Sequence, residues 1–262
     1  MASQGPLGWG VPLVLTLLSV QGLREFAAMA ECKGLFPQKG TLFVAAVCYI
    51  FGLYAVQKQE LWRSQLPFDE ACLFTVLFFL LLIEGFKKQC GGENICAFKT
   101  LAISLAGFIY VPWCLGFTMK ILYFFENGRG LQFLIFLLLV SKSTDIFAYL
   151  AGKALGTHKL ADKISPKKTV EGSLGGLVGA TALALVSQKT FLPDLSVPQA
   201  LLFGFTVSAV SQLGDLAESL LKRDAGCKDS GSLICGMGGV LDLLDSILFT
   251  APFLYFLMCA LV

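Results

Sequence analysis

The residues best suited to chemistry lie in one stretch of the C-terminal half, SQLGDLAESLLKRDAGCKDSGSLICGMGGVLDLLDS. In its first part, polar residues recur at helical spacing along an otherwise apolar segment. This stripe consists of Asp215, Glu218, Ser219 and Lys222. After Gly239, we expect a second short helix that places Asp242 and Asp245 on one face. The pattern therefore predicts acidic residues on one face of each of two helices.

Basic residues and glycines lie between these two acidic groups. The basic residues are followed by a glycine-rich turn, Gly236-Met237-Gly238-Gly239, in which positive φ and close approach of backbone N–H groups to a ligand are allowed. Carboxylates can hold a hard cation such as Mg²⁺, which bridges phosphate oxygens, while Lys and Arg bind the remaining oxygens. The set favours phosphate chemistry over an internal salt-bridge network, which leaves the glycines unexplained. The charged residues that lead from the end of the first helix to this turn are Lys222, Arg223, Lys228 and Asp229.

A second candidate lies upstream in SKSTDIFAYLAGK, where Lys142, Asp145 and Tyr149 fall on one helical face. An ionisable residue at membrane depth is costly and usually faces the interior of a helix bundle. The alternative is a Lys142–Asp145 pair that only joins helices.

A third candidate is the basic loop LGTHKLADKISPKKTVEGSLGG. Pro166 ends the preceding structure, and residues 169–172 have the signature of a helix start. A helix N-terminus beside Lys167 and Lys168 can hold a phosphate. The alternative is a loop that only satisfies topology or touches anionic headgroups.

The elements that position these residues are apolar. The chain is 56% hydrophobic and 15% charged, whereas soluble domains carry about 25% charged residues. Apolar segments close to spanning length predict an all-α, polytopic transmembrane helix bundle with about eight spans. The net charge of +2 indicates no nucleic-acid partner. The segments fall near 9–29, 41–56, 71–86, 97–118, 131–151, 170–188, 199–221 and 245–262.

The distribution of Lys and Arg among the connections predicts the orientation. The odd-numbered connections carry fourteen of these residues and the even-numbered ones five, with Lys142 left inside a span. The positive-inside rule then places the odd connections in the cytoplasm and both termini outside it. We expect the first segment to be a retained helix, because no Lys or Arg precedes it as in a signal peptide. We interpret the chain as one integral domain, with residues 1–130 structural and 131–262 catalytic.

The nine cysteines include no CxxC pair and the chain has one His, so no zinc site is indicated. We interpret all nine as thiols.

The motif residues resemble the phosphatidate cytidylyltransferase (CDP-diacylglycerol synthase) family. The resemblance covers about residues 130–262 and includes Asp145 to Tyr149, the 165–172 segment and Gly214-Asp215. Three positions differ from the family pattern: Met237 replaces a usual His, Cys235 a Pro or Gly, and Leu243 an Arg. The matching residues are Ser219, Lys222, Arg223, Lys228, Asp229, Gly231, Gly238, Gly239, Asp242 and Asp245.

The resemblance implies that CTP and phosphatidate give CDP-diacylglycerol and pyrophosphate. It implies metal ligands (Asp215, Asp242, Asp245), catalytic residues (Asp215, Asp242, Lys222, Lys228) and substrate-binding residues (Lys167, Lys168, Ser219, Arg223, Asp229, Gly238, Gly239, Asp145). The expected cofactor is Mg²⁺, with room for a second cation. The expected partners are CTP, phosphatidate and membrane lipids, and a homodimer is compatible with this interpretation. The compact length fits a bacterial inner membrane, with an organelle membrane as the alternative, and we expect the site to face the cytoplasm.

Three alternatives stay open at this point. A CTP-dependent kinase of a lipid alcohol would use similar groups but release CDP. An anion transporter would need no clustered carboxylates, and no pair of broken helices in repeated halves is visible. A catalytically inactive scaffold would account for Met237 and Leu243.

Overall fold

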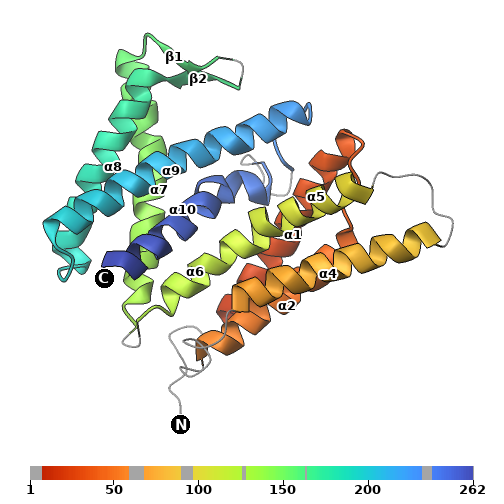
Figure 1. Ribbon diagram of the computed structural model, residues 1–262. Coiled ribbons are helices and arrows are strands. Elements are labelled where there is room, and N and C mark those ends of the chain that lie inside the picture. Colours follow the sequence, from red (N-terminus) through yellow and green to blue (C-terminus); the bar gives the residue numbers. More distant parts are fainter. Residues whose placement is uncertain are drawn as a thin grey trace. The chain divides into compact units, whose positions relative to one another are not determined.

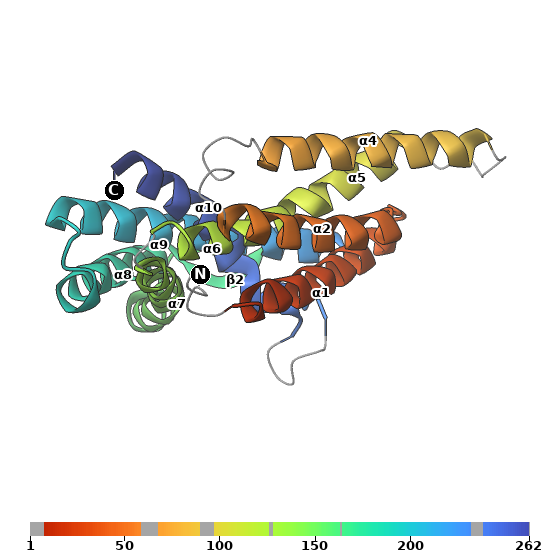
Figure 2. The same cartoon turned by 90° about the horizontal axis from the view of Figure 1, so that it is seen from below.

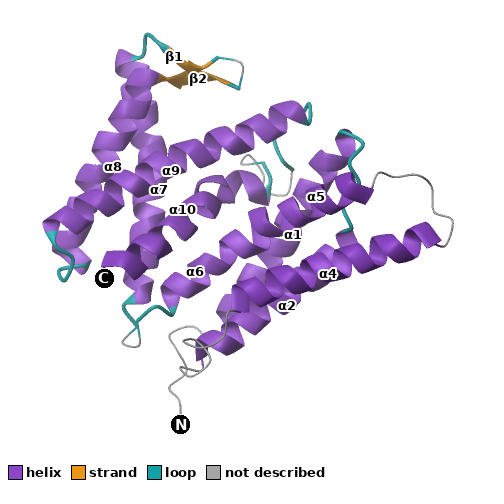
Figure 3. Cartoon of the chain, in the orientation of Figure 1, coloured by secondary structure: helices purple, strands orange, loops and turns teal. Residues whose placement is uncertain are grey.

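The computed structural model describes residues 8–58, 68–89, 97–125, 128–162, 164–231 and 238–261, and helices dominate them (Figure 3). Long helical stretches coincide with all eight predicted apolar segments, which confirms the all-α class. The fourth stretch runs through α5, a π-helical turn η1 and α6 without a break. The helical elements are α1 Gly10–Cys32, α2 Lys39–Lys58, α4 Phe68–Gln89, α5 Ala97–Phe108, η1 Ile109–Trp113, α6 Cys114–Leu122, α7 Gly130–Leu155, α8 Val170–Phe191, α9 Val197–Asp224 and α10 Val240–Leu261.

Seven of the described helical stretches are long and apolar enough to cross a membrane. The chain is therefore an integral, multi-pass membrane protein. α4 is not among the seven because charged residues flank its apolar centre, with Asp69 and Glu70 in its first turn and Glu84, Lys87 and Lys88 toward its other end. The Gln38 side chain, just before α2, donates a hydrogen bond to Glu84 over 2.7 Å, so this charge has a partner inside the protein. The eight helical stretches agree with the predicted number of about eight spans.

Two compact units make up the described chain, and the first comprises residues 8–119 with 225–241. Here α1 packs against α2 and η1, and α4 packs against α5 and α2 (Figure 2). Leu23, Tyr49 and Phe108 are fully buried in this unit. The segment 225–241 groups with these N-terminal helices although it follows α9 in sequence. The functional division of the chain at residue 130 stays a prediction.

The second unit comprises residues 120–224 and 242–261, and α7, α8 and α9 pack on one another in it. α8 approaches α7 closely at Gly176, where an added Cβ would lie only 2.9 Å from the carbonyl oxygen of Thr144. Buried hydroxyl pairs join α7 to α9: Ser141 with Ser211 at 3.1 Å, and Thr144 with Ser208 at 3.0 Å. Small and hydroxyl-bearing residues are the usual means of close helix association in membranes.

The predicted basic loop between α7 and α8 contains a β-hairpin, which the sequence did not reveal. Strand β1 (Lys159–Ala161) pairs antiparallel with β2 (Ser165–Thr169), and the hairpin lies beyond the ends of α7 and α8 (Figure 1). Strands of three and five residues are too short to produce a readable alternation of apolar and polar residues. The pairing therefore depends on backbone hydrogen bonds that the side-chain pattern does not record.

The second short helix expected after Gly239 is instead the first part of α10, which runs unbroken to Leu261. Pro252 lies within this helix without ending it. No glycine or proline separates Val240 from the start of the last apolar segment at residue 245, so nothing in the sequence terminates the helix in between.

Six of the nine cysteines lie in the described part of the chain, and all six are free thiols. The prediction of thiols is thus confirmed for this set. The six are Cys32, Cys48, Cys72, Cys114, Cys227 and Cys259.

Candidate active site

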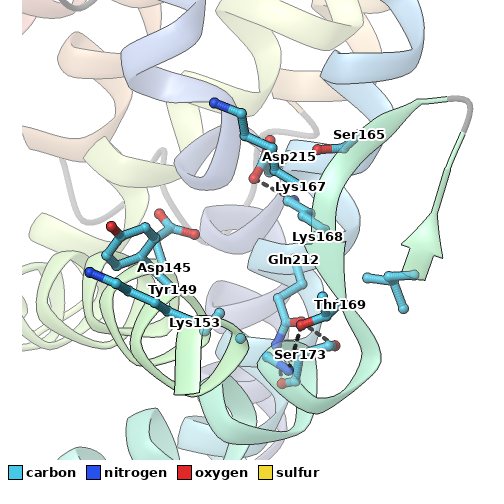
Figure 4. A pocket seen from close by; sticks show the side chains of 14 residues that line it. Asp145, Tyr149, Lys153, Ser165, Lys167, Lys168, Thr169, Ser173, Gln212 and Asp215 are labelled. Carbon is cyan, nitrogen blue, oxygen red and sulfur yellow. Dashed lines mark hydrogen bonds and ion pairs between the residues drawn. The ribbon is translucent and has the colours of Figure 1, made fainter. Parts of the chain in front are cut away.

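A pocket of about 410 Å³ lies in the second unit, lined by residues of α7, the hairpin, α8 and α9 (Figure 4). Four predicted site residues from three separate segments line it: Asp145, Lys167, Lys168 and Asp215. The pocket therefore joins the helix face upstream, the basic segment and the acidic stripe, which the sequence presented as three separate candidates.

An ion pair between Lys168 and Asp215 crosses this pocket, with 2.5 Å between Nζ and Oδ2 (Figure 4). Lys168 is brought there by β2, which ends at Thr169. The Thr169 hydroxyl accepts a hydrogen bond from the N–H of Gly172 over 3.1 Å and caps α8. The predicted helix start is confirmed, and it places Lys167 and Lys168 immediately before the N-terminus of α8.

Glu171, in the first turn of α8, holds the segment before the hairpin. Its carboxylate accepts hydrogen bonds from the Thr157 hydroxyl over 2.6 Å and from the backbone N–H of His158 over 3.2 Å. It also lies 2.6 Å from Nδ1 of the His158 ring. These contacts fasten the start of the basic segment to the first turn of α8.

Two further lysines pair with the aspartates of α10 in the same unit. Lys222 of α9 contacts Asp242 at 2.6 Å. Lys142 of α7 lies 3.9 Å from Asp245, and it also donates to the Ser246 hydroxyl over 3.2 Å. The side chains of Asp242 and Asp245 are only 11% and 15% exposed, so both carboxylates are largely withdrawn from solvent. The alternative pair Lys142–Asp145 is not among the ion pairs of the described residues.

Glu218 completes the acidic group and is the most deeply buried member of it. Its side chain is 0% exposed, and neither carboxylate oxygen has a hydrogen-bond partner among the described residues. Lys222 lies 3.4 Å from one of these oxygens. A buried carboxylate with spare acceptor capacity is costly unless a cation or donor approaches it.

The carboxylates are close enough to one another to interact electrostatically. Asp145 interacts with both Asp215 and Asp245, and Glu218 with Asp242 and Asp245. Within the described ranges no three acidic, His or Cys side chains converge as ligands of one metal ion. The aspartates 215, 242 and 245 are instead each paired with a lysine. The donor set is all carboxylate oxygen, which suits Mg²⁺, and neither oxygen of Glu218 has a hydrogen-bond partner among the described residues.

The remaining predicted residues of α9 have weaker contacts. The Ser219 hydroxyl donates to Asp215 over 3.4 Å, and Arg223 Nε donates to the carbonyl oxygen of Ile164 over 3.3 Å. Arg223 is exposed, and this contact is to the hairpin turn. Both residues are therefore beside the charged group rather than buried in it.

The other four predicted residues belong to the first unit. Lys228 and Asp229 are exposed, and Gly238 has a φ of +87°, a conformation that an L side chain rarely adopts. A Cβ at Gly239 would lie 2.3 Å from the Ser230 hydroxyl, so only glycine fits there. The positive φ predicted for the glycine turn is confirmed at Gly238.

A family model for the cytidylyltransferase family matches residues 4–261. The chain belongs to the cytidylyltransferase family. Its similar relatives include the phosphatidate cytidylyltransferase of a Synechocystis strain, which is 34% identical with 97% of this chain and 90% of the relative covered. The enzyme of the same name from Staphylococcus saprophyticus is 40% identical over 94% of this chain and 90% of its own length. The phosphatidate cytidylyltransferase of Bacillus subtilis is 40% identical over 72% of this chain and 67% of its own length.

One of the three departures from the cytidylyltransferase pattern can be placed in the structure. Leu243 is 39% exposed on α10, and its backbone carbonyl accepts a hydrogen bond from Lys142 over 3.1 Å. The lysine from α7 thus supplies a cation next to the position where the family usually has Arg. Met237 and Cys235 lie outside the described residues.

The pocket of this cytidylyltransferase is also lined by residues outside the predicted set of site residues. Gln212 lines the pocket one turn before Asp215 and donates to the carbonyl oxygen of Ser173 over 3.1 Å. Lys153 and Tyr149 line the same pocket from α7. Their spacing from Asp145 is helical, which was the available signal for Tyr149. Gln212 carries the same signal, because it precedes Asp215 by three residues on the polar stripe of α9.

Proposed function

We propose that this protein transfers the cytidylyl group of CTP to phosphatidate, giving CDP-diacylglycerol and pyrophosphate. The observation that carries the proposal is a set of partly buried Lys–Asp pairs in one unit: Lys168 and Asp215 line the pocket, and Lys222 pairs with Asp242. The relatives that cover most of the chain carry the name phosphatidate cytidylyltransferase, which agrees with this chemistry.

The reaction joins two anions, so charge repulsion is part of its barrier. A phosphate oxygen of phosphatidate forms a bond to the α-phosphorus of CTP, and the bond from that phosphorus to the pyrophosphate oxygen breaks. A phosphate oxygen is already ionised at neutral pH, so no side chain has to remove a proton. The protein has to bring the two phosphates together and offset their charge.

The lysines are the groups that offset this charge. Lys168 and Lys167 precede the N-terminus of α8, and the positive end of this helix dipole also favours an anion. We assign these two lysines to the triphosphate or the departing pyrophosphate. Lys222 is assigned to a phosphate of CTP or of the lipid. When substrate binds, Lys168 and Lys222 each exchange an aspartate partner for a phosphate oxygen.

The aspartates released by this exchange are the proposed metal ligands. Asp215 and Asp242 would hold Mg²⁺, with Asp245 next, and Asp145 would support this polar region. When bound, Mg²⁺ supplies positive charge to the phosphate oxygens. A second cation and a homodimer stay predictions, and the mass of the detergent-solubilised protein tests the homodimer.

Labelled CTP gives the decisive test of the proposed function. With CTP labelled at the α-phosphate, purified protein and phosphatidate, we expect label in the lipid fraction and release of pyrophosphate. A CTP-dependent kinase would instead pass only the γ-phosphate, leaving the α-label in CDP. Label absent from lipid would contradict the proposal, and uptake of anions into sealed vesicles without any turnover would favour the transporter.

We propose further that the pocket faces the cytoplasm, in a bacterial inner membrane. The support is the excess of Lys and Arg in the odd-numbered connections and the bacterial origin of the relatives. Lys167 precedes α8 and Lys189 lies in its last turn, and both are exposed, so they form a matched pair at opposite ends of the helix.

A membrane-impermeant amine reagent should label Lys167 in inside-out vesicles and Lys189 in right-side-out vesicles. Peptide mass spectrometry reads the two sites in one sample. The reverse pattern would contradict the orientation. Labelling of both lysines from one side would contradict a membrane-spanning α8.

A further inference from the structure

A buried carboxylate in the N-terminal part of the chain contacts the motif segment that precedes α10. Glu25, on α1, is only 5% exposed. Its two oxygens accept the backbone N–H groups of Val240 over 2.9 Å and Leu241 over 2.8 Å. These are the first two residues of α10. Glu25 thus caps a helix that begins 215 residues further along the chain.

Two side chains complete the hydrogen bonding of this carboxylate. The Ser230 hydroxyl donates to Glu25 over 3.1 Å, and the Gln21 amide donates over 3.1 Å. A carboxylate has about four acceptor sites, and four donors are present. These four partners are all neutral, and the positive end of the α10 helix dipole favours the negative charge. The Glu25 carboxylate is therefore hydrogen-bonded by donors from the 225–241 segment and from its own helix.

The backbone around the carboxylate leaves no room for side chains. A Cβ at Gly231 would lie 2.9 Å from one Glu25 oxygen, and a Cβ at Gly239 would lie 2.4 Å from the other. Glu25 thus touches the 225–241 segment on both sides of its undescribed part. This contact explains why two motif positions are glycine, which a direct role in binding phosphate does not require.

We propose that Glu25 is a positioning residue for the motif segment, fixing the backbone that carries Lys228 and Asp229 and the start of the helix that continues into Asp242. A structural cap alone needs one acceptor at the helix end. Glu25 in addition fixes Ser230, which directly follows Asp229, so the same group controls both ends of the segment. The kinetic part of this inference rests on the proposed cytidylyl transfer.

The test compares Glu25→Gln with Glu31→Gln, a matched loss of one charge from the same helix. Glu31 is part-exposed and pairs with Lys39 at 2.7 Å. In Glu25→Gln, the new side chain keeps one acceptor oxygen and replaces the other with an amide group that cannot accept a backbone N–H. We expect kcat/KM to fall about 100-fold for Glu25→Gln, with a higher KM for CTP or phosphatidate, because small displacements of binding groups have effects of this size. Glu31→Gln should match wild type.

Hydrogen exchange separates this proposal from the proposed function. In wild type, the amides of Val240 and Leu241 should be protected, and Glu25→Gln should speed their exchange at least about tenfold while α2 amides stay unchanged. Hydrogen exchange is measured without any lipid product. Absence of cytidylyl transfer would therefore contradict the proposed function and leave the positioning role of Glu25 to be tested by exchange. Unprotected amides in wild type, or unchanged kinetics in a folded Glu25→Gln, would overturn the inference. If Glu25→Gln does not fold, Glu25→Asp is measured in its place. We expect the same fall in kcat/KM for Glu25→Asp, and kinetics equal to those of wild type would overturn the inference.

Discussion

Asp215→Asn and Asp242→Asn are each expected to lower CTP-dependent formation of CDP-diacylglycerol by about 1000-fold or more, since removal of one charged group at a transition state has effects of this order. Asn preserves the shape of each side chain but removes the negative charge and one acceptor oxygen. In the present geometry, Asp215→Asn also breaks the 2.5 Å pair with Lys168. Steady-state turnover with labelled CTP measures both variants.

The metal assignment is tested in the same experiment by titrating Mg²⁺. If the two aspartates hold the ion, residual activity should need higher Mg²⁺ than wild type does. Asp194→Asn is the control, because Asp194 lies in the same unit, 67% exposed, and pairs with Arg129. Full activity in either Asp215→Asn or Asp242→Asn would refute the assignment of that aspartate.

Lys222→Met is expected to abolish turnover and also to destabilise the protein. Met has a similar length but cannot pair with Asp242, and it leaves Glu218 buried without the cation that lies 3.4 Å away. Removing one partner of a buried pair costs about 3–5 kcal/mol, because the other charge stays uncompensated. The unfolding temperature in detergent and the turnover rate should therefore both fall.

The double variant Lys222→Met with Glu218→Gln separates these two effects. Neutralising Glu218 removes one of the two charges that Lys222 compensates, and Asp242 keeps the other, so part of the lost stability should return. Turnover should stay at background, because no cation binds the phosphate. Glu218→Gln alone provides the reference for the stability of the neutral side chain. Recovery of turnover in the double variant would contradict phosphate binding by Lys222 and would leave it only a structural role beside Glu218.

The spans and their order could be predicted from the sequence because membrane helices have a length and polarity that local composition records. Each predicted apolar segment coincides with a helix to within a few residues at most ends. The hairpin between α7 and α8 could not be predicted in this way. Its register, with Lys159 opposite Thr169, depends on backbone pairing and on the fastening of residues 157 and 158 by Glu171.

The candidate site was predictable only as residue types. Spacing along α9 and α10 placed Asp215, Glu218 and Lys222 on one face and Asp242 and Asp245 on another, and the structure keeps these faces. The pairing of charges was not predictable, because it joins residues from different helices. A Lys142–Asp145 pair was the alternative that the spacing offered, for example, yet the hydrogen bonds and the ion pair of Lys142 are to α10.

By itself, the sequence determined an all-α membrane protein of about eight helices and the residue types of a phosphate-handling site, since both follow from local composition and spacing. Tertiary structure decided which lysine meets which carboxylate, how Lys168 enters the pocket of Asp145 and Asp215, and that Glu25 caps α10. Buried polar groups need a partner, but the partner can lie anywhere in the chain, and only packing brings the two together.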